Sequence, residues 1–246
     1  MRKQERLSVI LDRVAERGSV DVSDLASAFG VSGATVRRDL QALSSGRLLV
    51  RTHGGAVARL VDAGPAASHQ AEKRRIGAAA ASLAGRGAVV GLTGGSTALE
   101  VVRALAHRRD ITFVTNAINI ASELVGGPGQ RLVVIGGIVR NSFELVGPAA
   151  EAMLANYHFD IAFIGVDGLT PRDGCTTHDE MEAQTDRAFL RRARRNVVIT
   201  DSSKIGKVTF ARICMVSDVD DIITDRGVSG EQLRSLASAG ARVTTV

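Results

Sequence analysis

Residues 20–39, reading VDVSDLASAFGVSGATVRRD, constrain the fold more than any other stretch, because they predict two short helices joined by a tight turn. Apolar residues recur in both segments at the three- and four-residue spacing of a helix with one buried side. Gly30 lies between them, where a helix commonly ends in the left-handed conformation that glycine adopts at little cost. Ser32 suits the N-cap of the second helix. The predicted core residues are Val22, Leu25, Ala26, Phe29, Val31, Val36, Leu40 and Leu43.

The start of the second helix predicts a surface that reads DNA. A helix presented in this way fits the major groove, where arginine suits guanine edges and its N–H groups meet phosphate. A second interpretation is that Arg37 and Arg38 solvate an ordinary surface helix, with Asp39 partly neutralising them. The candidate readers are Ser32, Gly33, Thr35, Arg37 and Arg38.

The flanking segments complete a small domain. Residues 47–57, RLLVRTHGGAV, combine an apolar run, a basic tip and two glycines that suit a hairpin turn, which predicts the wing of a winged helix. Arg51 and His53 would contact the backbone or the minor groove. Before the motif, an amphipathic helix ending near Gly18 is predicted from Leu7, Ile10, Leu11 and Val14.

These residues resemble the DeoR-type helix-turn-helix, chiefly through the runs TVRRDL and HGGA. The resemblance implies binding to operator DNA and, most often, repression of genes for sugar or sugar-phosphate metabolism. Asp39 would act either as a cap or as the orienting partner of a neighbouring arginine. The matching residues are Arg6, Ile10, Val14, Leu25, Phe29, Val31, Ser32, Thr35, Val36, Arg37, Arg38, Asp39, Leu40, Gly46, Arg51, Gly54, Gly55 and Ala56.

Charge and composition agree with a polyanion partner. The 246 residues include 31 Lys+Arg and 26 Asp+Glu, a net charge of +5, and residues 1–58 hold 9 basic and 6 acidic side chains. The start of the chain resembles no signal peptide and no segment predicts a membrane span, so a cytoplasmic protein without membrane contact is expected. Cys175 and Cys214 predict packed thiols rather than a disulfide, and no cluster has metal-ligand spacing. We expect no metal and no cofactor.

A change of pattern marks the domain boundary. Residues 59–70 contain small residues, one proline and no periodicity, which predicts a linker between a winged helix over 1–58 and an α/β domain over 71–246. In the second domain, short apolar runs alternate with helical segments, as in a Rossmann-like, mostly parallel sheet buried on both faces. The predicted strands are 88–92, 111–115, 131–136, 161–166, 196–200, 221–224 and 242–246.

Polar residues at the ends of these strands predict a ligand site, because open α/β sheets bind ligands beyond the carboxyl ends of their strands. A loop of glycines and hydroxyls, followed by a helix from Ala98, would suit phosphate, although structural glycines and an ordinary cap produce the same letters. It is neither a Walker loop nor a dinucleotide fingerprint. The loop residues are Thr93, Gly94, Gly95, Ser96 and Thr97.

The other strand ends predict a phosphorylated sugar or polyol as the ligand. Lys204 would be a point charge for phosphate, and Asp167 or Asp201 would accept from sugar hydroxyls, although each could instead be a solvated loop charge. The remaining candidates at strand ends are Thr115, Asn116, Gly136 and Gly137.

Residues 72–225 resemble the DeoR C-terminal sensor domain, through GGST, VTN, VIGG, ELVGP, IAFIGVDG, TDSSK and ITD. The resemblance implies a fold similar to ribose-5-phosphate isomerase and glucosamine-6-phosphate deaminase, and a sugar phosphate that releases the protein from DNA. It also implies a dimer or a tetramer. Two departures leave the effector open: Leu92-Thr93 replaces an acid before the loop, and Asp186 replaces a lysine before Arg187.

Two other functions remain as alternatives. A sugar-phosphate isomerase fused to a DNA-binding domain would use Asp167 as base and Lys204 at the enediolate oxygen. However, Leu169 and Thr170 stand where the isomerase has a second acid, and no glycine run follows Lys204. A basic scaffold protein without an effector would not need polar residues at successive strand ends.

Overall fold

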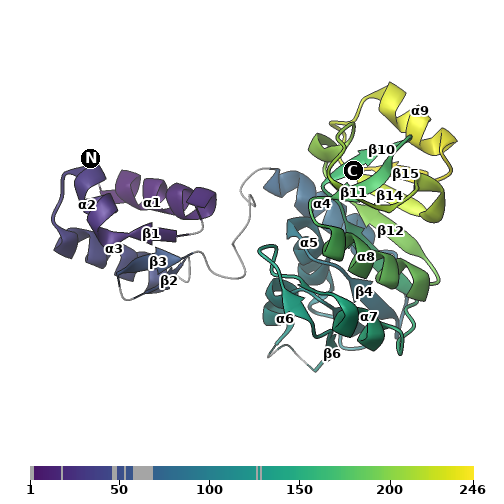
Figure 1. Ribbon diagram of the computed structural model, residues 1–246, viewed down its shortest axis with the longest axis horizontal. Coiled ribbons are helices and arrows are strands. Elements are labelled where there is room, and N and C mark those ends of the chain that lie inside the picture. The colour runs from purple at the N-terminus through teal and green to yellow at the C-terminus, as the bar shows by residue number, and fades with distance from the viewer. Residues whose placement is uncertain are drawn as a thin grey trace. The chain divides into compact units, whose positions relative to one another are not determined.

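The computed structural model describes residues 3–17, 19–45, 49–52, 54–57, 69–125, 127 and 129–246. Contacts divide the chain between residues 68 and 69 into two compact units, shown in purple and in blue to yellow in Figure 1. Most of the predicted linker over 59–70 lies outside the described residues. Its last residue, Gln70, already begins a helix.

The N-terminal unit has the three helices and the wing that the sequence predicts. Three short strands form one antiparallel sheet in the order β1-β3-β2. Because Gly55 lies against the backbone of Val20, where a Cβ would meet the carbonyl oxygen at 1.9 Å, only glycine fits at this pairing. The elements are α1 (Lys3–Arg17), β1 (Ser19–Asp21), α2 (Val22–Phe29), α3 (Gly33–Ser45), β2 (Val50–Arg51) and β3 (Gly55–Val57).

One small apolar core holds this unit together, and it contains the residues predicted from helical periodicity. Ile10 of α1, Leu25 of α2 and Leu40 of α3 are nearly fully buried in it. On its edge the guanidinium of Arg13 lies 5.2 Å from the ring centroid of Phe29. This packing rigidly supports the outer side of α3.

The second unit is built on a seven-stranded parallel sheet in the order β15-β14-β12-β9-β4-β5-β6 (Figure 1). All seven predicted strands form, and each ends at most two residues from its predicted end. The strands are β4 (Val89–Leu92), β5 (Thr112–Thr115), β6 (Arg131–Val134), β9 (Ile161–Gly165), β12 (Asn196–Ile199), β14 (Asp221–Thr224) and β15 (Arg242–Thr245).

Helices cover both faces of this sheet, which explains the continuous apolar runs of its central strands. Phe163 of β9 faces α4, α5 and α6, whereas its neighbours Ala162 and Ile164 face α7, α8 and α9. The helices are α4 (Gln70–Ala81), α5 (Ser96–Leu105), α6 (Ile118–Leu124), α7 (Pro148–Leu154), α8 (Glu180–Arg192) and α9 (Gly230–Ser238), with short 3-10 helices η1 (Ser202–Lys204) and η2 (Val216–Asp218).

Two small antiparallel sheets were not predicted from the sequence. β7 (Ile138–Val139) pairs with β8 (Leu145–Val146), and β10 (Gly168–Thr170), β11 (Gly174–Thr177) and β13 (Ala211–Cys214) form the other. Cys175 and Cys214 are both free and buried, as predicted, yet they are directly opposed across β11 and β13. Because the two cysteines are far apart in the sequence, no local pattern indicated that they lie opposite each other.

The order of the strands reverses at β4. The chain runs from β4 outward through β5 to β6, and then returns to place β9 on the other side of β4. The loops after β4 and β9 therefore diverge, which is where open parallel sheets form ligand-binding crevices. Within the described part of the chain, no helix is long and apolar enough to span a membrane.

Candidate functional site

The turn before α3 has the geometry predicted from its residues. Gly30 adopts the left-handed conformation, with φ of 63° and ψ of 35°, and ends α2. The hydroxyl of Ser32 accepts from the backbone N–H of Thr35 at 3.2 Å, as an N-cap does, and lies 3.0 Å from the hydroxyl of Thr35. Gly33 begins the helix directly after this cap.

The outer face of α3 is exposed and basic. Arg37 and Arg38 are exposed, and Gln41 follows one turn later on the same face. Arg51 of the wing donates to the side-chain oxygen of Gln41 at 2.6 Å, so the wing is tied to α3. His53, the other predicted wing residue, lies outside the described residues.

Asp39 is turned away from this face, which corrects one sequence interpretation. Its carboxylate accepts from Arg6 of α1 at 2.8 Å, and the two side chains are only 3% and 11% exposed. Asp39 is therefore the orienting partner of an arginine, but that arginine is Arg6. It forms no ion pair with Arg37 or Arg38 in the described structure, and their charge stays available to a polyanion.

The loop after β4 places backbone N–H groups at the start of a helix. Gly95 has a φ of 105°, which an L side chain rarely adopts, and α5 begins at Ser96, two residues before the predicted start. The hydroxyl of Thr93 accepts from the N–H of Gly165 at 3.0 Å and so joins the ends of β4 and β9. Thr97 lies in the first turn of α5 and is buried. A Cβ on Gly95 would meet no atom within 4 Å, so open space lies beside the loop.

The ends of β5 and β6 lie on one flank of this loop. The hydroxyl of Thr115 accepts from the N–H of Ala117 at 3.1 Å, which fixes the turn. Asn116 is fully buried and donates to the carboxylate of Glu144 at 3.1 Å. After β6, Gly136 opens to free space, whereas Gly137 packs against the backbone of β8.

The ends of β9 and β12 lie on the other flank. The ammonium of Lys204 is 3.4 Å from the carboxylate of half-buried Asp167, so the structure brings these two predicted residues together. Asp201 is buried and caps η1 by accepting from the N–H of Ser203 at 3.0 Å.

Lys73 of α4 was missed in the sequence because its helix precedes the first strand. It is buried, and burial lowers its pKa, while the nearby charge of Asp201 acts in the opposite direction. The charges of Lys204 and Glu100 also act on it. A second ammonium group therefore belongs to this edge of the sheet.

Three buried acids beside the loop were also missed as site residues. Glu144 directly precedes β8, and Glu182 and Asp186 lie one turn apart on the buried side of α8. Burial raises the pKa of Glu144 to about 8, the charge of Glu182 adds to this, and the hydrogen bond from Asn116 opposes it. Burial raises the pKa of Asp186 as well, and Glu144 is the next cause. No group of acids, histidines or cysteines in the described structure has the arrangement of a metal site.

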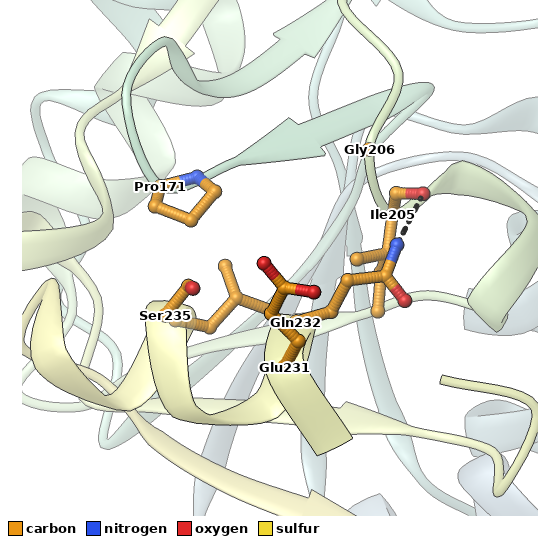
Figure 2. Close-up of a pocket in the computed structure, with 7 residues that line it drawn as sticks. Pro171, Ile205, Gly206, Glu231, Gln232 and Ser235 are labelled. Atoms are coloured by element: carbon orange, nitrogen blue, oxygen red, sulfur yellow. Dashed lines mark hydrogen bonds between the residues drawn. The ribbon is translucent and has the colours of Figure 1, made fainter. Parts of the chain in front are cut away.

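A separate cavity of about 140 Å³ lies between β10, η1 and α9 (Figure 2). The side-chain amide of Gln232 donates to the carbonyl of Ile205 at 3.4 Å across one wall. None of the predicted effector residues lines it, although Ile205 directly follows Lys204. Its lining is mostly apolar, and Glu231 is the only charged residue there.

These features define a protein that combines a winged helix-turn-helix with an α/β unit bearing polar groups at a topological switch point. A family model described as the DeoR-like helix-turn-helix domain matches residues 6–59, and one described as the DeoR C terminal sensor domain matches residues 68–226. The chain belongs to the DeoR family of DNA-binding transcriptional regulators.

Curated relatives match over nearly their whole length. A putative aga operon transcriptional repressor of Escherichia coli O157:H7 is 36% identical, covering 98% of this chain and 93% of the relative. The transcriptional regulator GlpR of Haloferax volcanii is 32% identical over 97% and 96% of the two chains. The transcriptional repressor GlcR of Bacillus subtilis is 31% identical over 92% and 90%.

Solved structures show a partial likeness to the α/β fold. Ribose 5-phosphate isomerase A of Methanocaldococcus jannaschii is 22% identical and covers 56% of this chain and 55% of its own, with a TM-score of 0.42. The Pyrococcus horikoshii translation initiation factor eIF-2B is 15% identical over 85% and 74% of the two chains, with a TM-score of 0.41.

Proposed function

We propose that the protein represses genes of sugar or sugar-phosphate catabolism in the cytoplasm and leaves its operator when a phosphorylated sugar binds. The supporting observation is the loop at Gly94 and Gly95, which leads directly into the N-terminus of α5. This loop follows β4, where the order of the strands reverses. Lys73 and Lys204 lie at the same edge. The names of the relatives, two of which are called repressors, support the direction of regulation.

The phosphate would bind at the loop formed by residues 93–97. Backbone N–H groups at the start of α5 and the hydroxyl of Ser96 would donate to its oxygens. Lys73 and Lys204 would supply two positive charges, which suit a phosphate dianion. The buried hydroxyls of Thr93, Thr115 and Thr97 and the backbone at Gly136 and Gly137 would hold the loop and its neighbours in shape.

The sugar would lie between the ends of β5 and β9. Asn116 and Asp167 present amide and carboxylate oxygens there, and Asp201 lies beside Lys73. We assign no catalysis to these groups. Asp167 and Lys204 are the pair that an isomerase would need, but Leu169 and Thr170 stand where the isomerase has its second acid. Turnover of ribose 5-phosphate would revive the enzyme alternative.

The DNA would be read by α3 and the wing of the winged helix, which we place in residues 1–58. Ser32, Gly33, Thr35, Arg37 and Arg38 would enter the major groove. Arg51 and His53 would contact the backbone beside it. We assign residues 59–70 to a linker and residues 71–246 to the sensor.

The chain would act as a dimer or a tetramer, because a two-fold operator requires two readers at fixed spacing. Effector binding would favour an arrangement that does not fit this spacing. A coupling of ~1–3 kcal/mol changes operator affinity by about 5- to 150-fold, which is enough for regulation.

Melting temperature against a panel of sugar phosphates tests the sensor, because a ligand that binds the native state raises it. The panel includes fructose 1-phosphate, tagatose 6-phosphate, glycerol 3-phosphate, ribose 5-phosphate and deoxyribose 5-phosphate. We expect a selective rise with one class, and release of operator DNA by the same compound. Lys73→Met should abolish the rise, whereas Lys207→Met, at an exposed lysine nearby, should retain it. If no phosphorylated sugar raises the melting temperature, the proposed sensor function is wrong.

A further inference from the structure

The buried acids beside the phosphate loop have no cation to balance them. In the described structure, Lys204 pairs with Asp167 and Arg140 pairs with Asp179, but no lysine, arginine or histidine forms an ion pair with Glu144, Glu182 or Asp186. All three side chains are at least nine-tenths buried. An uncompensated buried charge is costly, so in the empty site burial raises the pKa of Glu144 and Asp186 and these carboxyls retain protons, which an incoming cation could replace.

Donors in the described structure reach only part of the cluster: Glu182 accepts from the hydroxyls of Ser142 and Thr177, whereas one oxygen of Asp186 has no partner. Asn116 donates its amide nitrogen to the carboxylate of Glu144 at 3.1 Å and to the carbonyl of Leu145 at 3.2 Å, which fixes the orientation of the amide. In the part of the chain that the structure describes, its carbonyl oxygen is then buried without a partner, as is one carboxylate oxygen of Asp186. Both atoms can only accept while Asp186 is ionised.

A hydroxyl between two of the acids shows the same shortage. The oxygen of Thr177 lies 3.1 Å from the carboxylate of Glu182 and also 3.1 Å from that of Asp167. A hydroxyl has a single proton, so it can satisfy only one of them. Thr177 thereby links the cluster to Asp167 and its partner Lys204.

The cluster adjoins the loop assigned to phosphate. A Cβ on Gly94 would lie 2.3 Å from a carboxylate oxygen of Glu144, so the loop backbone passes directly against this acid. A ligand whose phosphate sits on the loop would have its next atoms within reach of the cluster. This step rests on the proposed function.

We infer that the effector is a phosphorylated amino sugar, whose ammonium group binds among Glu144, Glu182, Asp186 and the carbonyl oxygen of Asn116. An ammonium group offers three N–H donors and one positive charge, which answers both shortages. A sugar hydroxyl offers one donor and no charge. A metal ion is disfavoured, because the described acids do not form a coordination cluster.

Calorimetric titration of the full chain tests this inference. The probes are glucosamine 6-phosphate and galactosamine 6-phosphate, their N-acetylated forms, and glucose 6-phosphate, galactose 6-phosphate and ribose 5-phosphate. We expect an amino sugar phosphate to bind at least about tenfold more tightly than its hydroxyl and N-acetyl counterparts, the effect of one charge-assisted hydrogen bond.

Isosteric variants show which side chains cause the preference for an amino sugar phosphate. Asp186→Asn and Glu182→Gln should lower the preference for the amino sugar phosphate to below about threefold, because each variant loses much of one charged contact. Glu180→Gln removes the same charge from an exposed position of the same helix and should keep the preference. Melting curves without ligand check folding, and Asp186→Asn should melt no lower than the parent because an amide of the same shape replaces a buried carboxyl that forms no ion pair in the described structure.

The outcomes separate this inference from the proposed function. If a neutral sugar phosphate binds as tightly as the amino sugar phosphates, or is the only class that binds, the inference is overturned while the sensor function stands. If none of the phosphorylated sugars binds, both are overturned. If Glu180→Gln loses the preference as Asp186→Asn does, the cluster is not its source.

Discussion

The two units of this protein place their charges in opposite ways. In the N-terminal unit the buried charges Arg6 and Asp39 balance each other, and the unbalanced arginines of α3 face outward. In the sensor unit the acids without an ion-pair partner in the described structure are inside, at Glu144, Glu182 and Asp186. The difference follows from the partner that each unit meets. A duplex is too large to be enclosed, so its reader must be exposed, whereas a small ligand can be surrounded and can complete a buried site.

The two units also differ in whether their binding site is complete before the partner binds. The reader is complete without DNA, since its core and the Arg6–Asp39 pair hold α3 in place. Among its described residues, the sensor keeps buried oxygen atoms without a hydrogen-bond partner at Asn116 and Asp186. Such groups destabilise the empty site, and this gives a ligand a means to shift the unit between states.

The largest effect is expected from the arginines of α3. Replacing both Arg37 and Arg38 by alanine should lower operator affinity more than 100-fold, because each contact to a base or phosphate contributes about 1–3 kcal/mol. Fluorescence anisotropy with labelled operator measures this. Stabilisation by the effector should be unchanged, and Lys3→Ala, which removes an exposed charge from α1, should have little effect. Joint loss of both activities would mean that α3 is structural.

Lys204→Ala should have the next largest effect, and on the other unit. Loss of one charge-assisted contact to phosphate should weaken effector binding by about 10- to 100-fold, as measured by calorimetry, and leave operator binding intact. Lys207→Ala is the matched control at an exposed neighbour. Release of DNA at unchanged effector concentration in the Lys204 variant would show that the pocket lies elsewhere.

The pH dependence of stability should come from the interior of the sensor. Burial raises the pKa of Glu144 to about 8 from 4.5, with Glu182 and Asp167 adding and Asn116 opposing. Between these values the native state keeps a proton that the unfolded state has lost, so the free energy of unfolding should fall as pH rises, by up to about 1.4 kcal/mol per unit. Urea titrations from pH 5 to 8 measure the slope. Glu144→Gln should flatten it and Glu180→Gln should not, and equal slopes in both would refute the assignment.

The smallest effect is expected from the wing. Arg51 already donates to Gln41, so Arg51→Ala should weaken DNA binding by less than about tenfold. It should act equally on operator and unrelated DNA and reduce the salt dependence by about one counterion. Affinity measured at several salt concentrations gives this slope. A loss confined to the operator would instead make Arg51 a reader of sequence.

Much of this architecture could be predicted from the sequence, because periodicity records which side of an element is buried. The spacing of Leu25 and Leu40, the glycine at Gly30 and the cap at Ser32 predicted the helix-turn-helix. Continuous apolar runs predicted the parallel sheet. The strand ends that bear Gly94 and Asp167 were also visible, since each residue closely follows a strand, and Lys204 lies in the 3-10 helix η1 after β12.

What the sequence determined by itself was therefore local: the elements, their buried faces and the polar residues at their ends. The tertiary structure decided which distant residues meet. The pairing of Arg6 with Asp39, the approach of Lys73 to Asp201, and the meeting of Glu144 with residues of α8 each depend on how helices pack and strands are ordered. Periodicity specifies that a side chain is buried, but its partner is set by chain crossovers that no local pattern encodes.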